Sequence, residues 1–412
     1  MQVPFREALA YWLQLGFTSF GGPAGQIAAL HREVVERRRW IDEERFAHAL
    51  NFCMLLPGPE AQQLATYVGW LLHGRLGGVV AGALFVLPSA LILWALSWLY
   101  VEHGELPAVA ATFAGLQPAV LALIAAAIPR LARRSCRSLP GIALALFALG
   151  VSAFDLLPFP AVVLVGAFVG ALALRPVQRV AVERAAPVSL ASTLRVALAC
   201  LVLWWLPVGL AGLLQGWDGL LVRQGLFFSE TACVTFGGAY AVLPHVAESA
   251  VERFGWLSAE EMLAGLGLAE TTPGPLIMVV QFVGFLGGWR AEGTLAPLAS
   301  ATLSAALVTW VTFLPCFLWV FVGAPHVERL RGAPRLAGAL AGITAAVVGV
   351  VATVALWFGR RVLVDERGGL DLFALGLAVV AFGLLQWKKV PSAAVVVACA
   401  GLGLLRGLAA GG

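Results

Sequence analysis

The sequence predicts an all-α, polytopic membrane protein built from two homologous halves that form an inverted repeat. Hydrophobic residues make up 60% of the 412 residues and charged residues only 12%. A soluble domain of this size would carry about a quarter charged residues. The apolar residues form long runs, and the motifs that interrupt these runs occur twice, in the same order. These observations predict the fold class before any functional residue is considered.

The apolar runs predict the helices. Compared with the roughly 20 residues that a helix needs to cross a bilayer, the sequence contains about thirteen segments. Backbone inside lipid must satisfy its own hydrogen bonds, so helices broken only at sheltered points are expected. Short alternating segments, which would predict a β-barrel, are not a feature of the chain. The segments lie near 5–20, 45–72, 77–101, 107–129, 139–155, 158–175, 193–215, 219–236, 259–288, 295–323, 334–358, 370–387 and 391–409.

An internal repeat relates the two halves. A shift of 216 residues places Phe20-Gly21-Gly22 on Phe236-Gly237-Gly238 and Pro57-Gly58-Pro59 on Pro273-Gly274-Pro275. The shift later becomes 227 and places Leu87-Pro88 on Leu314-Pro315. Chance similarity of apolar sequence aligns leucines and alanines, but it does not align Gly-Gly and Pro-Gly-Pro motifs at one offset. The two halves are therefore expected to share one fold.

The domain boundaries follow from this repeat. The charged, proline-containing stretch from Arg175 to Arg195 is the expected linker. We expect a first repeat at 1–175, a linker with a connecting transmembrane segment at 176–218, and a second repeat at 219–412. Six segments in each half and one connecting segment give seven crossings between equivalent elements, an odd number that inverts the second half. If the Pro-Gly-Pro segments re-enter the membrane without crossing it, this count must be made again.

The two breaks in each half form the predicted binding site. Proline and glycine unwind helices, and a helix that restarts after a break points free N–H groups and its positive dipole end at the gap. Such ends bind anions, and inverted copies bring them together at the midplane. Kinks that only help helices pack are the alternative. The predicted substrate-binding residues are Gly21, Gly22, Gln26, Pro57, Gly58, Pro59, Gln62, Gln63, Gly237, Gly238, Thr271, Thr272, Pro273, Gly274, Pro275 and Gln281.

Two acids beside the breaks are candidates for proton coupling. Glu60 follows the first Pro-Gly-Pro and Glu270 precedes the second. A carboxylate at membrane depth is costly and is usually functional. The acids are not equivalent in the repeat, because Glu270 aligns with Met54 and Glu60 aligns with Leu276. Each half therefore contributes different polar groups to a similar break.

Other chemistry is not indicated by the sequence. The six cysteines and six histidines are dispersed, with no Cys-x-x-C pair and no His-Glu-x-x-His motif. No metal, cofactor or enzymatic activity is therefore expected. A net charge of +4 spread over short loops does not predict a nucleic-acid partner. Small-xxx-small pairs such as Gly166 with Gly170 permit close helix contact and allow a homodimer.

The motifs resemble those of a known family. The stretches FTSFGGPAGQIAAL and LLPGP in the first half, and TFGGAYAVLPHV, GWLSAEEML and ETTPGPLIMVVQFVGF in the second, closely resemble the chromate ion transporter family, long two-domain type. The resemblance implies a secondary transporter that exports chromate across the cytoplasmic (inner) membrane and confers chromate resistance. It also implies sulfate as a related oxyanion. A permease for sulfate or another inorganic anion, or an importer, is the alternative. Met54 stands where the family usually has a glutamine.

Overall fold

The computed structural model describes residues 3–20, 22–104, 106–174, 190–236, 238–293, 295–324, 334–364, 368–388 and 390–411. Its described part is helical apart from one isolated β-bridge between Val364 and Leu370. The first repeat contains α1 (Phe5–Thr18), α2 (Gly22–His31), the π-helix η1 (Arg32–Arg37), α3 (Glu43–Cys53), α4 (Glu60–His103), α5 (Pro107–Ser135), α6 (Leu139–Ala153) and α7 (Phe159–Ala173). A connecting helix, α8 (Leu190–Gln215), follows.

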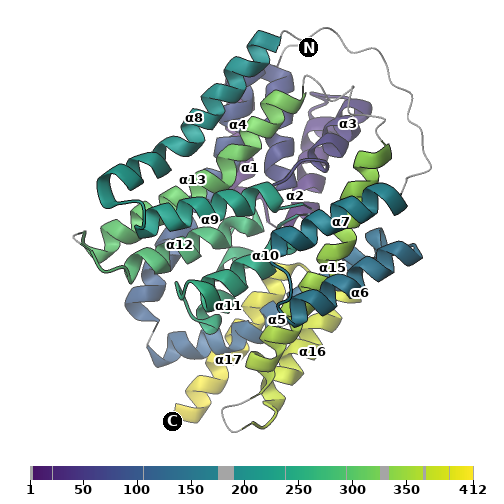
Figure 1. The fold of residues 1–412 in the computed structure, drawn as a ribbon. Coiled ribbons are helices and arrows are strands. Elements are labelled where there is room, and N and C mark those ends of the chain that lie inside the picture. Colours follow the sequence, from purple (N-terminus) through teal and green to yellow (C-terminus); the bar gives the residue numbers. More distant parts are fainter. Residues whose placement is uncertain are drawn as a thin grey trace.

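The second repeat has the same order of elements (Figure 1). It contains α9 (Leu220–Val234), α10 (Ala239–Glu248), the π-helix η2 (Ser249–Arg253), α11 (Ala259–Thr271), the short 3₁₀-helix η3 (Leu276–Met278), α12 (Val279–Trp289), α13 (Pro297–Gly323), α15 (Pro334–Leu363), α16 (Leu372–Gln386) and α17 (Ser392–Gly411). The breaks predicted at Phe-Gly-Gly and Pro-Gly-Pro are confirmed, because helices end and restart at each of them.

Local structure repeats at the offset that the sequence gives. Asp42 caps α3 by accepting from the N–H three residues later, and Ser258 caps α11 in the same way. Both π-helices end in a loop whose tryptophan N–H donates to a carbonyl six residues earlier at 2.8 Å, from Trp40 and from Trp256. The same sequence pattern therefore produces the same backbone in both halves.

In each repeat the Phe-Gly-Gly break lies at the tip of a helical hairpin. In the first repeat the chain enters along α1 and returns along α2 and η1, because the Arg38 guanidinium reaches the Glu7 carboxylate at 3.2 Å. Trp40 also packs edge-on against Tyr11, with ring centroids 5.3 Å apart. In the second repeat Trp256 packs against Phe228. Both ends of each hairpin therefore lie together.

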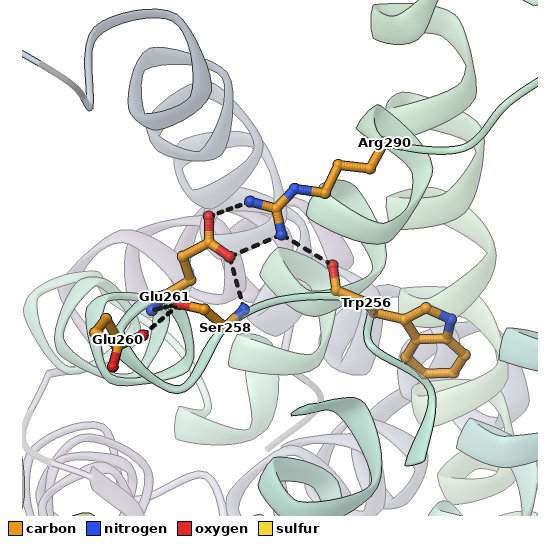
Figure 2. A network of polar contacts seen from close by, with 5 residues as sticks. All are labelled: Trp256, Ser258, Glu260, Glu261 and Arg290. Carbon is orange, nitrogen blue, oxygen red and sulfur yellow. Dashed lines mark hydrogen bonds and ion pairs between the residues drawn. The ribbon is translucent and has the colours of Figure 1, made fainter. Parts of the chain in front are cut away.

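The second Pro-Gly-Pro break also lies at a hairpin tip (Figure 2). Arg290, directly after α12, binds both carboxylate oxygens of Glu261 in the first turn of α11, at 2.8 and 2.5 Å. Arg290 also reaches the Trp256 carbonyl, and the Ser258 N–H donates to Glu261 at 2.7 Å. The ion pair joins the outer ends of α11 and α12, while Pro273-Gly274-Pro275 joins their inner ends.

The first Pro-Gly-Pro segment has the same arrangement. His31 bonds Glu43 at the start of α3 at 2.7 Å, and His73 at the far end of the helix after the break bonds the Val3 carbonyl at 2.7 Å. These outer ends therefore lie near the start of α1 and the end of α2. At His73 and Gly74 the backbone leaves the helical region, and the arm at 75–103 folds back on the arm at 60–72.

Tight glycine contacts hold this reversal. A side chain on Gly77 would meet the Gly69 carbonyl, and one on Gly82 would meet Thr66. Hairpin arms of 11 to 14 residues are about 17–21 Å long, which is too short to cross a hydrocarbon core of about 30 Å. The segments predicted at 45–72 and 259–288 as single interrupted helices are therefore pairs of short helices that return to the side from which they started.

The two repeats interlock through their later helices. In the first repeat α5 packs against α16 and α17 of the second, while α15 of the second repeat packs against α6 and α7 of the first. Gly166 and Gly170 lie against Gly338 and Gly342, so close that a side chain on Gly170 would strike the Gly338 carbonyl. Exchange of helices in both directions makes the two repeats one packed body.

Large apolar side chains cover the outside of the molecule. Leu164 and Phe168 on α7 are 69% and 68% exposed, and Leu213 on α8 is 75% exposed. Six described helices are long and apolar enough to cross a membrane, and four shorter apolar helices accompany them. A water-soluble protein does not present apolar surface on this scale. The chain is therefore a multi-pass membrane protein.

Candidate functional site

The four hairpin tips meet at one place, which we call the tip junction (residues 19–22, 57–59, 235–238 and 273–275). The Gly58 N–H donates to the Thr235 carbonyl at 2.7 Å, and the Gly274 N–H donates to the Ser19 carbonyl at 2.8 Å. The two bonds are equivalents at the offset of 216 residues. Each Pro-Gly-Pro tip of one repeat therefore binds the Phe-Gly-Gly tip of the other.

Glycine is required at both Pro-Gly-Pro centres. Gly58 and Gly274 have φ of +121° and +104°, a backbone conformation that side chains disfavour. A Cβ on Gly58 would lie 2.8 Å from Cys316 Sγ, and one on Gly274 would lie 2.5 Å from Ser89 Cβ. Ser89 and Cys316 follow the two Leu-Pro motifs, so they too are equivalents, at the offset of 227. Each tip thus packs against a proline-containing helix of the opposite repeat.

Glutamine side chains brace the junction. Gln26 Nε2 donates to the Gly274 carbonyl at 2.6 Å and to the Ser19 carbonyl at 3.2 Å, linking the tips of the two repeats. Gln63 Nε2 donates to the Pro57 carbonyl at 2.7 Å within its own tip. Farther out, Gln62 donates to Thr66, and Gln281 donates to the Ala90 carbonyl on α4 at 2.9 Å. All four amide side chains are buried.

The donors predicted for an anion are partly in use. The Gly58 and Gly274 N–H groups bond carbonyls across the junction, so they do not face an open gap in this state. The Thr271 and Thr272 hydroxyls donate to carbonyls of their own helix, at 2.9 and 3.1 Å. Of the other predicted residues, Gly22 and Gly238 lie at the tips with positive φ, Pro59 and Pro275 precede the restarting helices, Pro273 is buried, and Gly21 and Gly237 lie outside the described residues.

Several buried polar atoms at the junction have no hydrogen-bond partner among the described residues. They are the amide oxygens of Gln26, Gln62, Gln63 and Gln281 and the hydroxyl of Ser89. Buried polar groups are normally paired with protein or with ordered water. An apolar packing site would not carry five such atoms, so the junction has the polarity of a place that admits water or a polar ligand.

The helices that restart at the junction lack side-chain caps. Helix α4 begins after Pro59 and α10 begins after Gly238, and neither N-terminus has a capping side chain. The first N–H groups of a helix have no partner within the helix, and the positive end of the dipole lies there. Two such ends, one from each repeat, are therefore directed at the junction from α4 and α10.

The acids beside the tips differ between the repeats. Glu270 is buried in the last turn of α11, and its Oε1 accepts from the Tyr240 hydroxyl at 2.5 Å. At the equivalent positions of the first repeat stand Ala24 and Met54, and Met54 is 40% exposed. Glu60 occupies the first turn of α4, partly buried. The backbone of the junction is nearly two-fold, whereas its titratable groups are not.

Sequence reasoning missed three of these residues. Ser89 and Cys316 directly follow the repeated Leu-Pro pairs, so the second offset would have found them. Tyr240 lies two residues after the second Phe-Gly-Gly, but its equivalent is alanine, and the repeat gives no signal for it. Its contact with Glu270 depends on how two hairpins pack.

Comparison with known proteins gives consistent matches. A sequence model of the family described as Chromate transporter matches residues 6–172 and 222–404, two regions that begin 216 residues apart. The chromate transport protein of Pseudomonas aeruginosa is 33% identical, over 97% of this chain and 91% of that protein. That of Cupriavidus metallidurans is 31% identical, over 97% and 92%. The probable chromate transport protein of Synechococcus elongatus is 28% identical, over 97% and 95%. No solved structure matches the chain.

Proposed function

Because the chain belongs to the chromate transporter family, we propose that it is a secondary carrier that exports chromate across the cytoplasmic membrane and so confers chromate resistance. The observation that carries this proposal is the tip junction, where broken helices of both repeats meet inside a membrane protein. Secondary carriers bind substrate at the interface of such repeats, on broken helices near the bilayer midplane. A carrier of this kind catalyses no covalent reaction.

The hairpins support an inverted arrangement of the repeats. If the four hairpins return to the side from which they start, only the arm at 75–103, α5, α6, α7 and α8 separate the start of α1 from the start of α9. Five crossings are an odd number, so the second repeat enters from the opposite face. The parity is the same whether or not the short helices α6 and α7 cross fully. In Figure 1 the two termini also lie at opposite ends of the molecule.

The distribution of positive charge supports the same topology. Cytoplasmic loops of membrane proteins are enriched in Lys and Arg. The connections and helix ends that this topology places on the N-terminal side contain 20 of the 27 Lys and Arg residues. The other seven are Arg223, Arg253, Arg290, Arg360, Arg361, Arg367 and Arg406. The N-terminus and the linker between the repeats are therefore assigned to the cytoplasm.

The tip junction is the proposed oxyanion site. In the present state the Gly58 and Gly274 N–H groups bond carbonyls of the opposite repeat at 2.7 and 2.8 Å. Separation of the tips would free both N–H groups, together with the starts of α4 and α10, as donors to a tetrahedral oxyanion. Opening toward either face in turn would give alternating access. The closed junction is then the state without substrate, in which the tips satisfy one another.

Sulfate has the shape and charge of chromate, so backbone donors distinguish the two poorly. The test uses inside-out vesicles from a host that lacks its own chromate carriers, and follows labelled chromate with and without a proton gradient or a membrane potential. Uptake above that of vesicles without the protein, stronger competition by unlabelled chromate than by sulfate, and chromate resistance of the host are expected. No uptake under either gradient would refute chromate export. Uptake that only sulfate suppresses would assign the carrier to sulfate.

A Gly376→Ala variant is the matched control. Gly376 lies in α16, and no atom lies within 4 Å of the position of an added Cβ. Its transport is expected to equal that of the wild type, whereas Gly58→Val is expected to transport no chromate.

A further inference from the structure

The Tyr240–Glu270 hydrogen bond joins two hairpins that the chain does not otherwise connect at this depth. Tyr240 lies in the first turn of α10, two residues after the tip glycine Gly238. Glu270 lies in α11, three residues before Pro273 at the other tip. The hydroxyl donates to Glu270 Oε1 at 2.5 Å, and the glutamate is only 7% exposed. The bond therefore spans the two arms that lead into the tip junction.

Two further elements supply groups to the same carboxyl. Ser392, at the start of α17, donates a hydrogen bond to it, and the positive charge of Arg130 on α5 acts on it electrostatically. Both α5 and α17 pack against α11. Among the described residues, the groups that act on Glu270 are thus Tyr240 on α10, Ser392 on α17 and Arg130 on α5. A buried carboxyl with a hydroxyl partner on a separate hairpin is a site that binds one proton.

We propose that Tyr240 and Glu270 form the proton site that couples transport, with Tyr240 as the positioning residue that links protonation to hairpin movement. The inference rests on the proposed function. A hydroxyl that donates to a carboxylate favours its ionised form, and loss of that donor favours protonation. When the tips separate to admit the oxyanion, the α10 hairpin leaves α11 and the bond breaks. Glu270 then takes a proton from water as a neutral carboxyl, and releases it when the bond forms again.

The asymmetry of the repeats sets the number of protons at this site. Ala24 and Met54 occupy the equivalent positions in the first repeat and carry no titratable group. One pair in the whole chain binds one proton for each transport cycle. A two-fold arrangement of the pair would have given two.

The experiment uses the full chain in liposomes that contain a pH-sensitive dye, and records chromate and proton movement together across a pH series. Tyr240→Phe should retain transport and shift its pH midpoint upward by about one unit, a tenfold change in proton affinity. Glu270→Gln should give chromate movement that is independent of pH and carries no proton. Tyr100→Phe is the matched control, because Tyr100 packs its ring against Phe113 and Phe282, and it should leave the profile unchanged.

A second measurement separates this inference from the proposed function. Infrared difference spectra of the purified protein during a pH titration should contain a buried carboxyl band that Glu270→Gln removes and Tyr240→Phe shifts. Wild-type protein that moves no chromate but shows this band would refute chromate transport and support the proton site. Variants with the wild-type pH profile, proton movement and band would overturn the Tyr240–Glu270 proposal, whatever the carrier transports.

Discussion

Replacing Gly274 with alanine tests whether the tip junction requires glycine for two separate reasons. The backbone of Gly274 has φ of +104°, and a Cβ there would lie 2.5 Å from Ser89 Cβ and 2.7 Å from Ser89 Oγ. The left-handed backbone costs about 1–2 kcal/mol for a residue with a Cβ. Overpacking of a filled interior adds roughly 1–3 kcal/mol. Gly274→Ala should therefore destabilise the folded protein by about 2–5 kcal/mol.

Two other glycines separate these terms. Gly238 has φ of +91° with no atom within 4 Å of an added Cβ, so Gly238→Ala carries only the backbone term of about 1–2 kcal/mol. Gly376 in α16 has neither cost, and its replacement by alanine in a helix stabilises by about 0.5–1 kcal/mol. The expected order of stability is Gly376→Ala, then wild type, then Gly238→Ala, then Gly274→Ala.

The assay is the temperature at which half of the detergent-purified protein is lost from the monodisperse peak in size-exclusion chromatography. Chromate uptake per folded molecule is measured on the same preparations. Gly274→Ala should also lower uptake, because displacement of the tip disturbs the bond from Gly274 to the Ser19 carbonyl. If Gly274→Ala is as stable as Gly376→Ala, the described packing at the tip is wrong, and the argument from close contact fails.

Three further predictions concern contacts outside the tip glycines. Gln26→Leu leaves the Ser19 and Gly274 carbonyls without their buried donor, at about 1–3 kcal/mol each, and should reduce uptake per folded molecule; uptake equal to the wild type would contradict the bracing role. A double-mutant cycle of Glu261→Gln and Arg290→Gln should give a coupling of about 0.2–1 kcal/mol, since Arg290 is half-exposed, and 1 M salt should remove most of it; a coupling that salt does not change would argue against a surface ion pair. The backbone N–H of Ala374, with Arg406, holds the pKa of the Asp371 carboxyl below its usual range despite partial burial. Its charge therefore stabilises the fold above the unfolded pKa of about 3.9, and this contribution is lost as the pH falls through the lower folded pKa. Asp371→Asn should thus be less stable than wild type at pH 7 and equal to it in strong acid, as thermal stability at the two pH values will test.

Much of the fold could be predicted from the sequence. Apolar run length predicts membrane helices because a bilayer admits only segments with satisfied backbone, and Pro and Gly predict breaks because they remove donors or permit positive φ. Gly58 and Gly274 were identified in this way. What failed was the number of crossings, because an apolar run of 28 residues such as 45–72 has the same composition whether it crosses once or forms a hairpin.

Contacts between hairpins could not be predicted from either hairpin alone. Arg290 and Glu261 lie 29 residues apart and are ordinary loop charges in the sequence, yet their ion pair joins the two outer ends of one hairpin. Likewise, the sequence predicted free N–H groups at Gly58 and Gly274. The structure instead pairs them with Thr235 and Ser19, because the opposite repeat supplies carbonyls that its own Phe-Gly-Gly break leaves unpaired.

By itself, the sequence determined the class of protein, the two-fold repetition and the positions of the breaks, because these depend on local chemistry and on spacing along the chain. Only the tertiary structure decided that the breaks are hairpin tips, that tips of opposite repeats bind each other, and that Tyr240 reaches Glu270. These depend on which surfaces meet when the helices pack. Equivalent residues such as Met54 and Glu270 occupy similar backbone, so the repeat could locate the site but could not show which half carries its proton chemistry.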